Sequence, residues 1–198
     1  MKTLLVATTN PGKLREIRAL MADVRVKLIA LTDIAPIEEP EETGATFEEN
    51  ARLKARYYAA HSGIWTVAED SGLVIDALGG EPGVRSARFL RPDASYPQRF
   101  NEIFRRLDAQ PDRPRTARFV AALASVDDGE VVYETTGAVE GEIAKVARGT
   151  SGFGYDPIFY YPPYGKTLAE VSEEEKIAVA HRGIAFRNFA QWLARGLP

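Results

Sequence analysis

The stretch that decides the fold is WTVAEDSGLVIDALGGEPG, residues 65–83. Residues 65–68 have the aromatic and β-branched content of a short buried strand, and Ser71-Gly72 is a turn signal that we expect to end it. Glu69 and Asp70 would then stand where the strand stops. Ligands of α/β proteins bind at such strand ends, so these carboxylates are candidates for holding a divalent metal or accepting a proton from water.

Asp70 is the better candidate of the two acids. Adjacent residues of a strand face opposite sides, so Glu69 and Asp70 share one site only if the strand has already broken. Asp70 lies next to the turn. The alternative interpretation is a solvated loop acid that caps a turn, and this stretch alone leaves both interpretations open.

Length and composition indicate an ordinary globular protein with a small partner. The 198 residues fit a single domain, residues 1–198, with two lobes around a cleft as a variant. A net charge of -3 gives no electrostatic case for polymeric nucleic acid. The absence of cysteine excludes disulfides, zinc–thiolate sites and thiol catalysis. The N-terminal apolar run is too short for a signal peptide and no later run could span a membrane, so we expect no membrane partner and a cytoplasmic location.

The N-terminus predicts an anion site between a strand and a helix. A buried strand over residues 2–7 leads into TTNPGK, residues 8–13, after which apolar residues recur at helical spacing. An N-cap followed by proline leaves backbone N–H groups beside hydroxyl and ammonium groups. A bare helix cap with a solvated lysine is the alternative, because the glycine spacing of a Walker loop is absent. The residues concerned are Thr8, Thr9, Asn10 and Lys13.

An acidic connection and a helix follow. The connection, residues 32–44, contains Glu41 and Glu42, and such a run is usually solvated surface. A capping box at residues 46–49 opens a helix that we expect to end at Gly63. Asn50 and Lys54 stand four residues apart and share a face of it.

The other elements complete an α/β pattern with antiparallel additions to the sheet. We expect strands at 26–31, 115–126, 130–139 and 142–146, a turn at 127–129, a separate apolar segment at 73–78 and a helix at 98–107.

Two further regions contain candidate binding residues. In the glycine-rich loop 148–156, Phe153 and Tyr155 are flanked by glycines, which suits an uncovered ring that stacks on a base; a ring tucked under its own loop is the alternative. After a capping box at 172–175, the positions of Lys176, His181 and Arg182 do not share a face of one helix. Either they are unrelated surface residues, or the helix breaks near His181 and brings them together.

Five blocks, in this order, resemble one family: TTNPGK (8–13), EETGATFEENARLKA (41–55), AEDSGLVIDALGGEPGVRSARF (68–89), GFGYDPIF (152–159) and EEKIAVAHRG (174–183). The family is that of the inosine/xanthosine triphosphate pyrophosphatases, the Ham1-like enzymes that hydrolyse ITP, dITP and XTP to the monophosphate and pyrophosphate. The resemblance implies an elongated two-lobed α/β fold with a central mixed sheet, an active-site cleft between the lobes, Mg²⁺ as cofactor and a homodimer. Apolar side chains between Phe89 and Phe104 also favour a dimer.

The resemblance also assigns roles to residues. Asp70 is implied as metal ligand and catalytic base, and a glutamate of the EETG segment as a second ligand, either Glu41 or Glu42. Glu69 departs from the family, whose members commonly carry an aspartate there. Residues implied to bind the triphosphate substrate are Thr8, Thr9, Asn10, Lys13, Lys54 and Ser71, and those implied to line the base pocket are Phe153, Gly154, Tyr155, Asp156, Lys176, His181 and Arg182.

The implied reaction is attack of water on the α-phosphorus with pyrophosphate as leaving group, and no covalent intermediate is required. One rival is a pyrophosphatase for pyrimidine or modified nucleotides. Another is a non-catalytic nucleotide- or RNA-binding module, against which the acidic balance and the carboxylates count.

Overall fold

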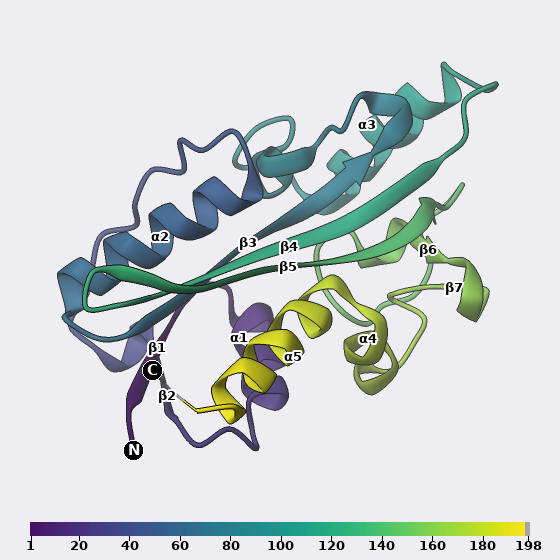
Figure 1. Ribbon diagram of the computed structural model, residues 1–198. Coiled ribbons are helices and arrows are strands. Elements are labelled where there is room, and N and C mark those ends of the chain that lie inside the picture. Colours follow the sequence, from purple (N-terminus) through teal and green to yellow (C-terminus); the bar gives the residue numbers. More distant parts are fainter. Residues whose placement is uncertain (197–198) are drawn as a thin grey trace. The chain divides into compact units, whose positions relative to one another are not determined.

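The computed structural model describes residues 1–196 as a mixed sheet flanked by helices (Figure 1). The strands are β1 Thr3–Ala7, β2 Lys27–Ala30, β3 Thr66–Ile75, β4 Thr116–Asp127, β5 Glu130–Ile143, β6 Phe159–Tyr161 and β7 Lys166–Thr167. The helices are α1 Pro11–Leu20, α2 Phe47–Ser62, α3 Tyr96–Asp108, α4 Glu173–Val179 and α5 His181–Ala194.

The strand order is β2-β1-β3-β4-β5-β6-β7. β1 pairs in parallel with β2 and β3, whereas β6 pairs antiparallel with β5 and β7. The expected α/β class with a mixed sheet and flanking helices is therefore confirmed. Among residues 1–196, no helix is long and apolar enough to cross a membrane.

The chain forms two compact units, each with its own core. The first unit contains residues 1–70, 121–137 and the segment from His181, and the second contains residues 71–120 and 138–180. The core of the first unit includes Leu4, Ile17, Trp65, Val67, Phe186 and Phe189. The core of the second unit includes Leu73, Phe100, Ile103, Phe119, Ile158 and Phe159.

In the first unit the helices cover both faces of the strands. α1 and α5 lie together on one face, and α2 lies on the other (Figure 1). α2 begins where the Thr46 hydroxyl accepts the N–H of Glu49, and it ends at Gly63, which adopts φ +66°. Both predicted boundaries are confirmed. Because side chains alternate along a strand, successive residues of β3 face different helices.

The expected end of the central strand at Ser71-Gly72 is wrong. β3 continues to Ile75, so it includes most of the segment that we expected to be separate. Gly72 is buried and extended rather than turned. A glycine within a strand can mark a turn, but it can equally mark a place where another backbone comes close. Here β3 lies between β1 and β4 in the sheet. The register pairs Ala7 with Ala68, so Glu69 and Asp70 follow the carboxyl end of β1 instead.

The other expected elements form with one exception. β4 and β5 make the hairpin, in which Asp128 and Gly129 adopt φ values of +49° and +81°. β5 runs on to Ile143, so the separate strand predicted at 142–146 is wrong. Glu142 and Ile143 pair with Tyr160 and Phe159 of β6, and this ladder keeps the end of β5 extended. The C-terminal helical region breaks at Ala180.

Candidate active site

The loop from β1 to α1 is a well-formed helix cap. The Asn10 side-chain oxygen accepts the N–H groups of Gly12 and Lys13 at 2.9 and 3.2 Å, and Pro11 occupies the first helical position. The Thr8 hydroxyl accepts the N–H of Asn10 at 3.2 Å, while Thr9 is exposed. The predicted N-cap is therefore present. Lys13 lies in the first turn, where the helix N-terminus favours negative charge.

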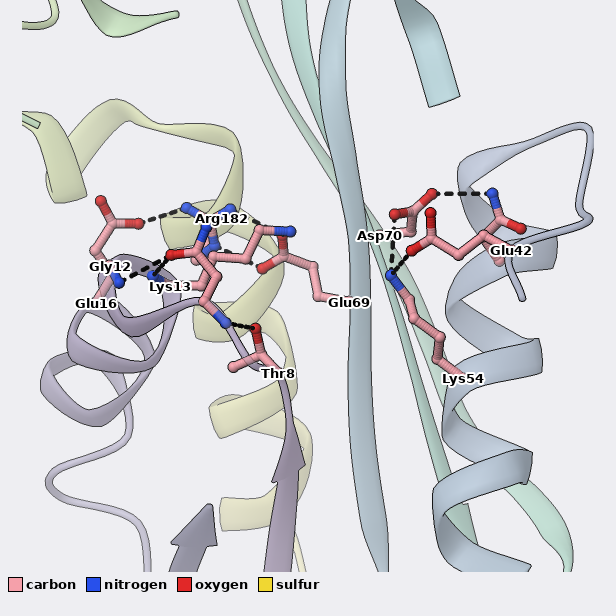
Figure 2. Close-up of polar contacts among 11 residues, drawn as sticks. Thr8, Gly12, Lys13, Glu16, Glu42, Lys54, Glu69, Asp70 and Arg182 are labelled. Carbon is pink, nitrogen blue, oxygen red and sulfur yellow. Dashed lines mark hydrogen bonds and ion pairs between the residues drawn. The ribbon is translucent and has the colours of Figure 1, made fainter. Parts of the chain in front are cut away.

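The first of two charged clusters lies on the side of β3 that faces α1 and α5 (Figure 2). We call it the Glu69 cluster, and its members are Lys13, Glu16, Glu69 and Arg182. Arg182 donates to both oxygens of Glu69, at 2.6 and 2.8 Å, and to Glu16 at 2.5 Å. The Lys13 ammonium lies 3.3 Å from Glu69.

Burial and charge act differently on the two cations of this cluster. Desolvation lowers the pKa of Lys13, and the nearby Glu69 does not fully offset it. Desolvation also opposes the charge of Arg182, but Glu69 and Glu16 outweigh it and raise the pKa. Arg182 therefore remains charged in the interior, balanced by two carboxylates.

The second cluster lies on the opposite side of β3, toward α2 (Figure 2). We call it the Asp70 cluster, and its members are Glu42, Asn50, Lys54 and Asp70. The Lys54 ammonium donates to Glu42 at 2.9 Å and to Asp70 Oδ1 at 3.0 Å. Asn50 Nδ2 donates to Asp70 Oδ2 at 3.2 Å. Each oxygen of Asp70 is thus held by a different residue of α2.

Asp70 is buried, only 6% exposed, rather than a loop acid. Burial raises its pKa, and Lys54 lowers it by less. Desolvation lowers the pKa of Lys54, but Asp70 and Glu42 together outweigh that effect and raise it. The site therefore contains a carboxylate with increased basicity beside a charged ammonium.

The structure distinguishes the two glutamates that the sequence left open. Glu42 is bonded to Lys54, whereas Glu41 is exposed on the surface. Glu42 and Asp70 both bond one ammonium, so their oxygens approach a common cation. Among residues 1–196, no group of three or more His, Cys, Asp or Glu side chains is arranged to hold a metal.

In the second unit, the structure brings several of the predicted base-pocket residues together. The Lys176 ammonium donates to Asp156 at 2.6 Å and lies 4.3 Å from the centre of the Phe153 ring. Asp156 also accepts the N–H of Phe153 at 2.8 Å. Phe153 and its neighbour Gly154 are partly exposed, as is Ser71 in the same unit.

Tyr155 does not have the uncovered ring expected from its glycine neighbours. Its ring is 4% exposed and packs edge-on against Tyr96, and its hydroxyl donates to the Ser86 carbonyl at 2.8 Å. Burial raises the pKa of Tyr155. This ring is therefore covered, as the alternative interpretation expected, but it is α3 that covers it through Tyr96 and Phe100.

His181 and Arg182 belong to the first unit and Lys176 to the second. The helix break expected near His181 is present, but that these three residues meet stays a prediction. Every nitrogen of the Arg182 guanidinium already donates to a carboxylate. The residue is also only 2% exposed, so its guanidinium lies in the interior of the first unit.

Sequence reasoning missed Glu16 and Asn50 as members of these clusters. Glu16 lies three residues after Lys13, so both are on one face of α1, and the spacing of Asn50 and Lys54 was visible. The alternation of side chains along a strand predicted that Glu69 and Asp70 face opposite sides of an unbroken strand, but no sequence signal showed which helix lies on each side.

The comparisons with known proteins agree with this architecture. A sequence model of the Ham1 family matches residues 4–192. The chain belongs to the Ham1 family. It is 45% identical to a dITP/XTP pyrophosphatase of Erwinia tasmaniensis over 99% of this chain and 96% of that protein. It is 44% identical to one of Geobacillus kaustophilus over 97% and 95% of the two chains. The structure of a HAM1 protein from Coxiella burnetii matches with a TM-score of 0.92 and 39% identity, over 99% of this chain and 100% of that one. The resemblance seen in the five sequence blocks is confirmed.

Proposed function

We propose that this Ham1-family protein is a nucleoside-triphosphate pyrophosphatase that removes the non-standard purine nucleotides ITP, dITP and XTP from the nucleotide pool. Relatives that bear the name dITP/XTP pyrophosphatase cover nearly the whole chain at more than 40% identity, which supports the substrate class. The observation that carries the proposal is the Asp70 cluster, which joins a basic carboxylate, a second carboxylate and an ammonium in one buried site.

The reaction requires a base and positive charge near phosphate. Water attacks the α-phosphorus, the bond from that phosphorus to the bridging oxygen breaks, and pyrophosphate leaves. Asp70 accepts the proton of the attacking water, a role favoured by the raised pKa that burial gives it. Lys13 and the N-terminus of α1 neutralise charge on the phosphates, and Lys54 contributes a second cation.

Glu42 and Asp70 suit Mg²⁺ by the chemistry of their donors. Both are hard oxygen ligands that approach one cation, the Lys54 ammonium, and Mg²⁺ in phosphoryl-transfer sites commonly takes one or two carboxylates plus phosphate oxygens and water. When bound, the ion supplies Lewis-acid stabilisation of the phosphate charge. We assign these two residues as its ligands, in preference to Glu41.

Base selection is assigned to the Phe153–Lys176 pair. A purine that stacks on the part-exposed Phe153 ring places its 6-oxo group near an ammonium donor, whereas adenine would present an amino group there. Adenine would place an amino donor against the ammonium donor and lose this hydrogen bond, at a cost of about 1–3 kcal/mol, which disfavours ATP. Guanine shares the 6-oxo group, so its rejection must depend on its 2-amino group.

A homodimer in the cytoplasm completes the proposal. Phe89 and Phe100 are buried in the second unit's own core, so they no longer support a dimer, whereas Leu90 and Tyr96 are 48% and 37% exposed. Light scattering should give about twice the chain mass of 21.8 kDa, and the mass of one chain would refute the dimer. We assign the cytoplasm because the free nucleotides that this enzyme would hydrolyse are found there.

One assay tests the function. Pyrophosphate release should be fast from ITP, dITP and XTP and much slower from GTP and ATP, and it should require Mg²⁺. Equal rates on all five nucleotides would refute the substrate class. Preference for a pyrimidine or modified nucleotide would support the rival pyrophosphatase, and nucleotide binding without hydrolysis would support a binding module.

A further inference from the structure

Asn50 occupies a position that neither the motifs nor the expected roles explain. It is fully buried near the start of α2, although asparagine is a residue that proteins usually leave exposed. A buried amide must have its hydrogen bonds satisfied. The partners of Asn50 therefore show what this residue does.

Three hydrogen bonds surround the Asn50 amide. Its Oδ1 accepts the N–H of Gly44 at 2.7 Å, and its Nδ2 donates to the Gly44 carbonyl at 3.4 Å. Nδ2 also donates to Asp70 Oδ2 at 3.2 Å. The Gly44 N–H needs an acceptor, so the amide is held with its oxygen toward Gly44 and its nitrogen toward Asp70.

The backbone of Gly44 comes unusually close to this amide. A Cβ placed on Gly44 would lie 2.6 Å from Asn50 Oδ1 and 2.9 Å from its backbone nitrogen. Only glycine permits that approach without displacement. The contact holds the acidic loop against α2, and the loop carries Glu42 two residues earlier.

Asn50 therefore links the two carboxylates of the Asp70 cluster. Lys54, one turn later on α2, joins Glu42 to Asp70 by charge, and Asn50 joins the Glu42 loop to Asp70 by directional hydrogen bonds. A lysine is a flexible point charge, whereas an amide has a fixed plane. Asn50 thus fixes the direction from which Asp70 Oδ2 is held, whereas Lys54 holds Oδ1 by charge.

We propose that Asn50 is the positioning residue of this site, which orients the Asp70 carboxylate and holds the Glu42 loop in place for the reaction. The kinetic part of this inference rests on the pyrophosphatase function proposed above. Outer residues that orient ligating carboxylates are commonly needed for 10–100-fold of activity or metal affinity.

The test compares two variants of Asn50 with a matched control. Asn50→Ala removes all three bonds. Asn50→Asp keeps an acceptor for the Gly44 N–H but removes the donor to Asp70 and places a like charge beside it. Thr46→Ala is the control, because it weakens the start of the same helix through its cap without touching Asp70.

We expect both Asn50 variants to lower kcat for ITP by about 10–100-fold with KM changed by less than about 3-fold. The affinity of the substrate-free protein for Mn²⁺, measured by electron paramagnetic resonance, should fall by a similar factor in Asn50→Ala. Exchange of the Gly44 amide hydrogen should accelerate in Asn50→Ala and stay slow in Asn50→Asp. Thr46→Ala should keep kcat, Mn²⁺ affinity and Gly44 exchange close to wild type.

Each variant is assayed the same number of degrees below its own melting temperature. The inference is overturned if kcat and Mn²⁺ affinity of the Asn50 variants then match those of Thr46→Ala. A rise in KM with unchanged kcat would also overturn it. If the wild-type protein releases no pyrophosphate from ITP, the proposed function fails instead, and Mn²⁺ affinity with Gly44 exchange then decides the role of Asn50. Should Asn50→Ala not fold, kcat of Asn50→Asp decides: a value equal to that of Thr46→Ala overturns the inference.

Discussion

The two sides of β3 place neighbouring acids in opposite electrostatic situations. In the Glu69 cluster two carboxylates face an arginine and a lysine, so the charges balance. In the Asp70 cluster two carboxylates and a neutral amide face one lysine, so negative charge is in excess. A balanced buried cluster holds elements together, whereas an excess of negative charge attracts a further cation. The difference supports a structural role for the Glu69 cluster and the chemical role proposed for the Asp70 cluster.

The largest expected effect is the loss of activity when the Asp70 cluster is changed. Asp70→Asn should lower kcat for ITP by about 10²–10⁴-fold, the usual range for loss of a general base, while the protein stays folded. Steady-state pyrophosphate release and circular dichroism check the two parts. Glu41→Gln, which changes an exposed acid of the same loop region, is the control and should keep its activity. Near-normal turnover of Asp70→Asn would end the base assignment.

Breaking the balanced side should instead affect stability. Arg182→Met removes the guanidinium that pairs with both buried carboxylates, Glu16 and Glu69, so the free energy of unfolding should fall by about 3–5 kcal/mol. Urea unfolding measures it. Arg118→Met is the control, because Arg118 pairs with Asp76 and Glu140 at a part-exposed surface and should cost below about 1 kcal/mol.

The same variant also tests whether Arg182 reads the base. A structural role predicts that the rates on ITP and ATP fall by one common factor. A base-reading role predicts that the ITP rate falls much further than the ATP rate, and that result would move Arg182 from the balanced cluster into the binding site.

Lys13 tests the comparison further, because it belongs to the Glu69 cluster and is also proposed to bind the phosphates of the substrate. Lys13→Ala should lower kcat/KM for ITP by about 10–100-fold, the value of one charge-assisted hydrogen bond. Lys2→Ala, which removes a lysine paired with Asp127 elsewhere in the first unit, should leave kcat/KM unchanged. An unchanged kcat/KM in Lys13→Ala would leave this lysine a structural role only.

The smallest expected effect is on the pH dependence of stability at Asp70 in the metal-free protein. Burial raises the pKa of Asp70 above its usual 3.8, so the folded state favours the protonated acid. Protonated Asp70 therefore contributes to the free energy of unfolding below pH 3.8, and this contribution is lost as the pH rises through the pKa of the folded state. In EDTA at pH 7, Asp70→Asn should therefore melt above wild type, and the difference should vanish in acid.

Glu102 gives the opposite sign as a control. Hydrogen bonds from Arg105 and Arg106 lower the pKa of Glu102 from 4.5 to about 2, so its contribution is present above 4.5 and is lost as the pH falls toward 2. Glu102→Gln should therefore melt below wild type at pH 7. If Asp70→Asn and Glu102→Gln shifted the melting temperature in the same direction at pH 7, the opposite pKa shifts of these two acids would not explain stability.

Local signals in the sequence were enough to predict the boundaries of α2 and the N-cap of α1. Asn10 and Thr46 are caps whose hydrogen bonds reach only two or three residues along the chain, and Gly63 ends α2 through its own φ. Such features depend on nearby backbone geometry, so composition and spacing determine them. The five blocks likewise identified the family before any contact was known.

The tertiary structure decided which residues each acid contacts. Ser71-Gly72 is a turn signal locally, but pairing with neighbouring strands kept β3 extended, because ladder hydrogen bonds outweigh a weak preference for turning. Glu42 rather than Glu41 shares the Lys54 ammonium with Asp70, in a loop whose Gly44 is hydrogen-bonded to Asn50. Whether a buried charge is balanced depends on residues more than a hundred positions apart, such as Glu69 and Arg182. Local sequence carries no information on such pairs.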